Sequence, residues 1–106
     1  MNQWEIRTYM FPDVGEHPAV IISHPTRAGK KATVEVLLCT TLRAGHNPEA
    51  HEVILNGADG LDWATLCRCD LIYSVSRSKL TTLRGTVSLA RRRDIIRKIV
   101  TSHGWV

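Results

Sequence analysis

The residues with the clearest chemical potential are Arg68 and Asp70, which stand two apart in the segment 66–71, Leu-Cys-Arg-Cys-Asp-Leu. Side chains two apart on a strand point to the same face, so this pair shares one face while Cys67 and Cys69 share the other. A carboxylate can take a proton while a neighbouring guanidinium holds a phosphate, a combination that suits attack by a ribose 2′-hydroxyl on its own phosphodiester. The same pattern is also typical of a plain surface ion pair.

The segments around this pair are predicted to form short strands followed by one helix. Alternating or unbroken apolar patterns predict strands over residues 4–11, 19–23, 34–41, 51–55 and 65–75. Residues 24–32 are predicted to form a mobile basic loop, and residues 78–80 a single helical turn. Apolar spacing predicts a helix from 89 to 102, with Ser88 as N-cap and Gly104 as the stop. This order indicates a mainly β (α+β) fold, a small antiparallel barrel or open sheet with a C-terminal α-helix.

Length and composition indicate one ordinary globular domain. The chain has 106 residues, of which 43% are hydrophobic and 23% are charged, so we expect a single domain over 1–106. No apolar stretch is long enough to span a bilayer, and no signal peptide is visible at the N-terminus. We therefore expect a cytoplasmic protein without a membrane partner.

Charge is divided unevenly along the chain. Residues 1–67 contain five Lys and Arg against eight Asp and Glu, whereas residues 68–106 contain nine against two. A basic C-terminal part suits a polyanionic partner, although a solvated basic surface without a partner explains the charge equally well.

The spacing of the cysteines and histidines does not predict a metal site. Three cysteines, Cys39, Cys67 and Cys69, are most simply read as free thiols, and neither paired Cys-x-x-Cys nor helical histidine spacing occurs. Glycine-rich phosphate loops and the Gly-x-Ser-x-Gly motif are missing as well. We expect neither a metal nor a cofactor.

Several short segments, taken in order, resemble the MazF/PemK (Kid) family of type II toxin–antitoxin toxins over nearly the whole chain. The matching pieces are residues 4–6 (Trp-Glu-Ile), 15–23 (Gly-Glu-His-Pro-Ala-Val-Ile-Ile-Ser), 36–41 (Val-Leu-Leu-Cys-Thr-Thr), 60–61 (Gly-Leu), 68–70 (Arg-Cys-Asp), 79–80 (Lys-Leu) and 84–88 (Arg-Gly-Thr-Val-Ser). The resemblance implies an SH3-like antiparallel β-barrel that forms a homodimer. It also implies metal-independent, sequence-specific cleavage of single-stranded RNA, which a cognate antitoxin blocks.

The resemblance also implies roles for individual residues. Asp70 matches the carboxylate base of the PemK/Kid branch, with Arg68 beside it. We expect Arg68 to act as an electrostatic stabiliser, because a guanidinium holds its proton too tightly to serve as an acid. Thr40 matches the threonine that contacts the scissile phosphate. Thr41 is its neighbour, and Thr65 falls near a polar position of the family. Both are predicted RNA-binding residues.

The chain departs from the family pattern at one position. Where the family has arginine before proline in the second strand, this chain has His17. Histidine can act as an acid–base group near neutral pH, so His17 is a predicted catalytic residue; the alternative is an ordinary loop histidine in a protein that has lost activity. Arg43 and Arg27 are predicted to supply the displaced positive charge to RNA.

A second interpretation comes from the CcdB gyrase poisons, which belong to the same structural superfamily and are not enzymes. They bind gyrase through a C-terminal helix that ends in Trp-Gly and an aliphatic residue, and this chain ends Gly104-Trp105-Val106. The simpler explanation of Trp105 is that its large ring packs on the barrel or in a dimer contact. A catalytically decayed relative that binds RNA is the third possibility.

Overall fold

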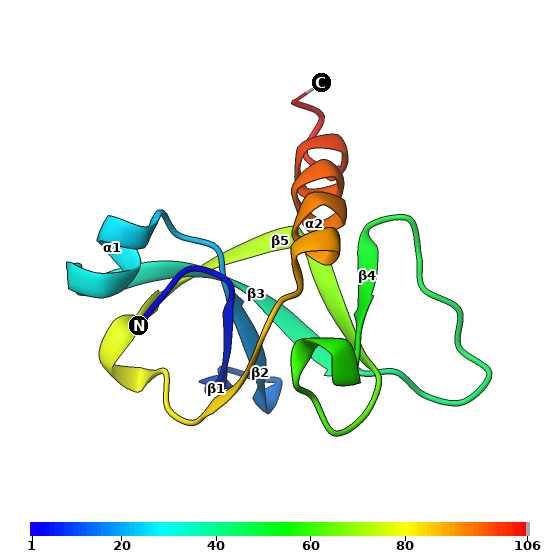
Figure 1. The fold of residues 1–106 in the computed structure, drawn as a ribbon, viewed down its shortest axis with the longest axis horizontal. Coiled ribbons are helices and arrows are strands. Elements are labelled where there is room, and N and C mark those ends of the chain that lie inside the picture. The colour runs from blue at the N-terminus through cyan, green and yellow to red at the C-terminus, as the bar shows by residue number, and fades with distance from the viewer. Residues whose placement is uncertain (106) are drawn as a thin grey trace.

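The computed structural model describes residues 1–105 and contains one six-stranded antiparallel sheet that curls into a half-barrel, with a helix across one face (Figure 1). The strands follow the order β4-β5-β3-β2-β1-β6. The elements are β1 (Glu5–Phe11), β2 (Gly15–Ile21), α1 (Pro25–Lys30), β3 (Thr33–Thr41), β4 (Glu52–Leu55), η1 (Gly57–Asp59), β5 (Thr65–Ser76), η2 (Arg77–Lys79), β6 (Leu83–Thr86) and α2 (Leu89–Ser102). The predicted antiparallel β-barrel fold with a C-terminal helix is confirmed.

Alternation along the strands divides the buried side chains into two clusters. The first includes Cys67 and Cys69 of β5 together with Ile95 of α2, so it lies between the sheet and the C-terminal helix. The second includes Ala28 of α1 and Leu38 of β3, and it fills the other side of the sheet. Burial of aliphatic side chains on both faces explains why the central strands have nearly continuous apolar sequences.

A buried carboxylate attaches the start of α2 to the rest of the fold. Asp59 is almost fully buried, and its carboxylate accepts hydrogen bonds from the backbone N–H groups of Asn56 (2.9 Å) and Ser88 (2.8 Å). The same carboxylate contacts Nη1 of Arg91 at 2.8 Å, and this nitrogen also donates to the carbonyl of Ile54 at 2.6 Å. The first turn of α2 is therefore held against β4 and η1 by charge-assisted hydrogen bonds.

Three elements differ from the sequence prediction. Strand β2 extends over Gly15–Ile21 and not over residues 19–23, so His17 lies within a strand. The predicted mobile loop over 24–32 contains the short helix α1, in which Pro25 stands at the first turn and the His24 side chain caps the N–H of Thr26 at 3.2 Å. Proline at the first turn favours a helix start because its φ is already helical. The strand β6 was not predicted, because its four residues become regular only by pairing with β1. Among residues 1–105, no helix is long and apolar enough to cross a membrane.

Gly85 of β6 passes so close to η1 that a side chain cannot be accommodated there. A Cβ at this position would collide with the carbonyl oxygen of Asp59 and approach the Cα of Gly60 at 3.3 Å. We expect Gly85→Ala to lower the free energy of unfolding by about 1–3 kcal/mol, because backbone must move to admit the methyl group. Urea denaturation measures this, with Gly57→Ala as the control, since a Cβ there meets no atom within 4 Å. Equal stability of the two variants would contradict the close contact.

Candidate functional site

A hollow of about 380 Å³ lies at the end of the sheet where β2 begins and β3 ends. We call it the Thr40 hollow. Its lining combines two cations, two imidazoles, a carboxylate and two hydroxyls, supplied by His17, Thr40, Thr41, Arg43, His46, Glu52, Leu66 and Arg68. Cationic and hydroxyl donors around an open hollow are the groups that bind a phosphodiester.

The strand register explains why these side chains converge. Thr40 of β3 pairs with Leu66 of β5, and Arg68 of β5 pairs with Glu52 of β4. Paired residues and residues two apart on a strand share a face, so all four side chains lie on one side of the sheet. His17 reaches the same hollow from the start of β2, on the other side of β3. The sheet thus brings together residues that are far apart in sequence.

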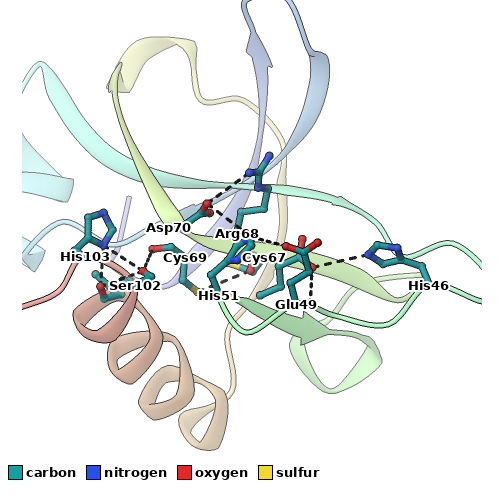
Figure 2. A network of polar contacts seen from close by, with 11 residues as sticks. His46, Glu49, His51, Cys67, Arg68, Cys69, Asp70, Ser102 and His103 are labelled. Atoms are coloured by element: carbon teal, nitrogen blue, oxygen red, sulfur yellow. Dashed lines mark hydrogen bonds and ion pairs between the residues drawn. The ribbon is translucent and has the colours of Figure 1, made fainter. Parts of the chain in front are cut away.

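Arg68 and Asp70 share a face of β5, as predicted, but they do not occupy the same hollow. Nη2 of Arg68 lies 3.6 Å from Oδ2 of Asp70 (Figure 2). Asp70 lines an adjoining hollow of about 500 Å³ with Ala50, His51, Thr101 and Ser102, which we call the Asp70 hollow. Within residues 1–105, Nε of Arg68 and Oδ1 of Asp70 are buried without a hydrogen-bond partner. Unpaired buried atoms are costly and are typical of sites that serve a ligand.

A second charged contact continues from Asp70 to the loop before β4. Nε2 of His51 lies 3.7 Å from Oδ2 of Asp70 and 3.7 Å from Oε2 of Glu49 (Figure 2). Ser102, at the end of α2, donates to the carbonyl of Cys69 at 3.3 Å beside this group. Asp70 is therefore held between an imidazole and the guanidinium of Arg68.

The four predicted RNA-binding residues divide into two pairs. Thr41 and Arg43 line the Thr40 hollow. Arg27 does not, because it lies on α1 beside the beginning of β3, where its Nε is 3.4 Å from Oε1 of Glu35. Thr65 is buried on the opposite face of the sheet and donates to the carbonyl of Trp63 at 3.2 Å. These two residues lie outside the hollow.

Sequence reasoning missed two polar residues of the Thr40 hollow, His46 and Glu52. Nε2 of His46 lies 3.9 Å from Oε1 of Glu52, and this oxygen accepts a 2.9 Å hydrogen bond from the backbone N–H of Glu49. Glu52 is buried and His46 is half exposed. The only signal in the sequence was the position of His46 in the loop that follows the Thr40-Thr41 strand end.

Three free thiols, those of Cys39 on β3 and of Cys67 and Cys69 on β5, lie on the face of the sheet opposite Arg68 and Asp70. Hydrogen bonding with the thiols of Cys39 and Cys69, together with burial, raises the pKa of Cys67 well above its ordinary value. The hydrogen bond with Cys67 lowers the pKa of Cys69, and the positive charge of Lys98 acts in the same direction while burial opposes it. The thiols pack as small apolar groups and support the strand from behind.

Comparison with known proteins identifies the family and the fold of this chain. The sequence profile described as the PemK-like, MazF-like toxin of type II toxin–antitoxin systems matches residues 2–102. The chain belongs to this toxin family. No curated protein sequence matches the chain.

Solved structures of MazF toxins share the fold of this PemK/MazF-like chain. An endoribonuclease in complex with its cognate antitoxin, from a mycobacterial species, has a TM-score of 0.83 at 21% identity, covering 98% of this chain and 95% of that chain. The Mycobacterium tuberculosis toxin MazF-mt6 has a TM-score of 0.80 at 18% identity, covering 94% and 96%. A MazE–MazF structure from Deinococcus radiodurans has a TM-score of 0.76 at 17% identity, covering 98% and 95%. At these identities the likeness establishes the fold.

Proposed function

We propose that this PemK/MazF-like toxin is a metal-independent endoribonuclease that cleaves single-stranded RNA through attack of a 2′-hydroxyl on the adjacent phosphodiester. The observation that carries the proposal is the convergence of His17, Thr40 and Arg68 in one open hollow. These residues come from β2, β3 and β5, and together they supply a proton-transfer group, a hydroxyl donor and a fixed cation. A single-stranded substrate suits the hollow, because an unpaired chain can bend its backbone into it.

Each of the three residues has a role that its chemistry suits. The guanidinium of Arg68 neutralises the charge that builds up on the phosphate oxygens, and the hydroxyl of Thr40 donates to one of them. Arg68 keeps its proton throughout, because guanidinium is too weak an acid to release it. His17 gives a proton to the leaving 5′-oxygen. Its Nε2 lies 3.3 Å from the carbonyl oxygen of Val14, which leaves Nδ1 for the substrate.

Asp70 belongs to the proposed catalytic group through its contact with Arg68. The resemblance implies that its carboxylate is the base, and direct proton transfer to Asp70 requires the RNA to reach into the Asp70 hollow. In the present geometry its contact with Arg68, at 3.6 Å, orients the guanidinium. Whether it acts as the base or orients Arg68, the carboxylate is essential for full activity. The two roles differ in which atom accepts the proton of the 2′-hydroxyl.

The direct test is cleavage of a long single-stranded transcript by purified protein in excess EDTA. We expect cuts that leave a 2′,3′-cyclic phosphate and a 5′-hydroxyl. Asp70→Asn should lower the cleavage rate by about 10- to 100-fold, because a misplaced Arg68 loses much of its effect on the phosphate. Asp94→Ala is the matched control, since this carboxylate is half exposed on α2 and contacts only Arg97 among the ion pairs of residues 1–105. No cleavage by the wild-type protein, or cleavage that needs a metal, would contradict the proposal.

We further propose a cognate antitoxin and a second copy of the chain as partners. The structural neighbours include toxins in complex with an antitoxin. The α2 helix exposes Leu89 (74%) and Ile96 (50%), which one dimer contact would cover.

The gyrase-poison alternative rests on the C-terminus. Trp105 is 63% exposed and stacks on the ring of His103 with centroids 4.8 Å apart, so it does not pack on the barrel. Val106 lies outside the described residues. Toxicity that persists in Asp70→Ala but disappears when residues 105–106 are deleted would favour this alternative over RNA cleavage.

A further inference from the structure

Cleavage by a 2′-hydroxyl needs two proton-transfer groups, one to take the proton from the attacking oxygen and one to protonate the departing 5′-oxygen. The attacking and leaving oxygens lie on opposite sides of the phosphorus, so the two groups must reach the phosphate from different directions. The Thr40 hollow contains two imidazoles that meet this requirement, since His17 comes from the start of β2 and His46 from the loop between β3 and β4.

We propose that His46, oriented by Glu52, is the base that takes the proton from the 2′-hydroxyl, opposite His17 as the acid. This assignment rests on the proposed ribonuclease function and names the base of the same site.

The orientation of His46 supports this role. Its Nε2 faces Oε1 of Glu52 at 3.9 Å, and the hydrogen bond from the backbone N–H of Glu49 fixes that carboxylate. A carboxylate beside one ring nitrogen favours the tautomer with the proton on that nitrogen, so Nδ1 is free to accept a proton. Glu52 in turn is fixed by its position on β4, directly opposite Arg68.

The hollow around the two imidazoles carries more positive than negative charge, which suits a bound phosphate. Arg43 and Arg68 line the hollow as cations, and Glu52 is the carboxylate beside His46. Bound phosphate would be neutralised by the two arginines, and the imidazolium that forms on His46 would be stabilised by Glu52.

The position of Asp70 argues against a direct role as the base. Its Oδ2 contacts Arg68 and His51 at 3.6 and 3.7 Å. Asp70 lines the adjoining hollow, whereas His46 lines the same hollow as Thr40. His46 can therefore approach the 2′-hydroxyl of an RNA whose phosphate lies against Thr40 and Arg68.

The proposed step balances without any other reactant. The 2′-oxygen bonds to phosphorus as its proton passes to Nδ1 of His46. The bond from phosphorus to the 5′-oxygen breaks, and that oxygen takes the proton from Nδ1 of His17. The products are a 2′,3′-cyclic phosphate and a 5′-hydroxyl, and both imidazoles regain their starting states by proton exchange with water.

A substrate with an altered leaving group separates the two histidines. The probe is a single-stranded oligoribonucleotide that spans the site cut fastest by the wild-type protein in a long transcript. It is made in two forms, with the natural 5′-oxygen or with sulfur in its place at the scissile bond. A thiolate leaves without a proton, so the sulfur substrate needs the base but not the acid.

We expect His17→Ala to lose about 100-fold or more in rate on the oxygen substrate and to regain most of it on the sulfur substrate. His46→Ala should lose about 100-fold or more on both substrates, because the 2′-hydroxyl must still be deprotonated. Imidazole added to the solution should restore part of the His46→Ala rate. Glu52→Gln should lower kcat on both substrates while KM stays unchanged.

His24→Asn is the matched control, because it removes an imidazole but keeps a side chain that can cap α1. Recovery of His46→Ala on the sulfur substrate, or a wild-type rate for His46→Ala on either substrate, would overturn the assignment. If Asp70→Asn alone shows the loss on both substrates, Asp70 is the base and the assignment fails while the ribonuclease proposal stands. No cleavage of either substrate by the wild-type protein would overturn both.

Discussion

Arg68→Ala is expected to reduce the cleavage rate by about 100- to 1,000-fold, because the proposed mechanism has no other cation fixed on the face of β5 beside Thr40. Arg43 lines the same hollow, but it stands on the exposed loop after β3 and is not held by the sheet. Single-turnover cleavage of the transcript measures the effect with protein in excess. Arg68→Lys should recover only a small part of the rate, since an ammonium cannot bind two phosphate oxygens in a planar arrangement.

The control for this variant is Arg97→Ala on α2, where the arginine side chain is 72% exposed and pairs with Asp94 at 3.6 Å. It removes the same charge from the chain but not from the hollow, so its rate should stay close to that of the wild-type protein. The Arg68→Ala chain should also unfold at nearly the wild-type temperature, because the Arg68–Asp70 pair is about one third exposed and such pairs contribute little to stability. Equal loss of activity in both variants would show that net charge, not the position of Arg68, governs cleavage.

Asp59→Ala is expected to lower the free energy of unfolding by about 3–5 kcal/mol. This is the typical cost of removing one partner of a buried ion pair, because the other charge is left unpaired. The substitution deprives Arg91 and the backbone N–H groups of Asn56 and Ser88 of their shared acceptor. These groups join η1, the start of α2 and β4, so their loss frees the helix from the sheet. Urea denaturation followed by circular dichroism measures the change.

Asp62→Ala is the matched control for this prediction, since Asp62 is an exposed aspartate three residues farther along the same connection. Its stability should remain within about 0.5 kcal/mol of the wild-type value. An Asp59→Ala chain that is as stable as the Asp62→Ala chain would show that the buried carboxylate does not hold α2 in place.

The sequence was sufficient for the elements whose patterns are local. The helix over Leu89–Ser102 has the predicted bounds, because its apolar spacing and the stop at Gly104 lie within the segment itself. The division of β5 into a cysteine face and an Arg68–Asp70 face follows from the two-residue period of a strand. The prediction of a mobile loop over 24–32 was wrong. It gave weight to the basic composition and not to the helix start signals, Pro25 and the His24 cap.

Family membership also followed from short sequence segments, since segments such as Arg68-Cys69-Asp70 keep their order along the chain. Which of the candidate site residues lie together was decided by the tertiary structure. The pairing of β3 with β5 places Thr40 beside Leu66 and within the hollow of Arg68, while the same strand directs Asp70 into the adjoining hollow. The contact of His46 with Glu52 depends on the path of the loop between β3 and β4. Strand register and the path of a loop bring together residues that are distant in sequence. A local sequence pattern does not predict which of these residues will be in contact.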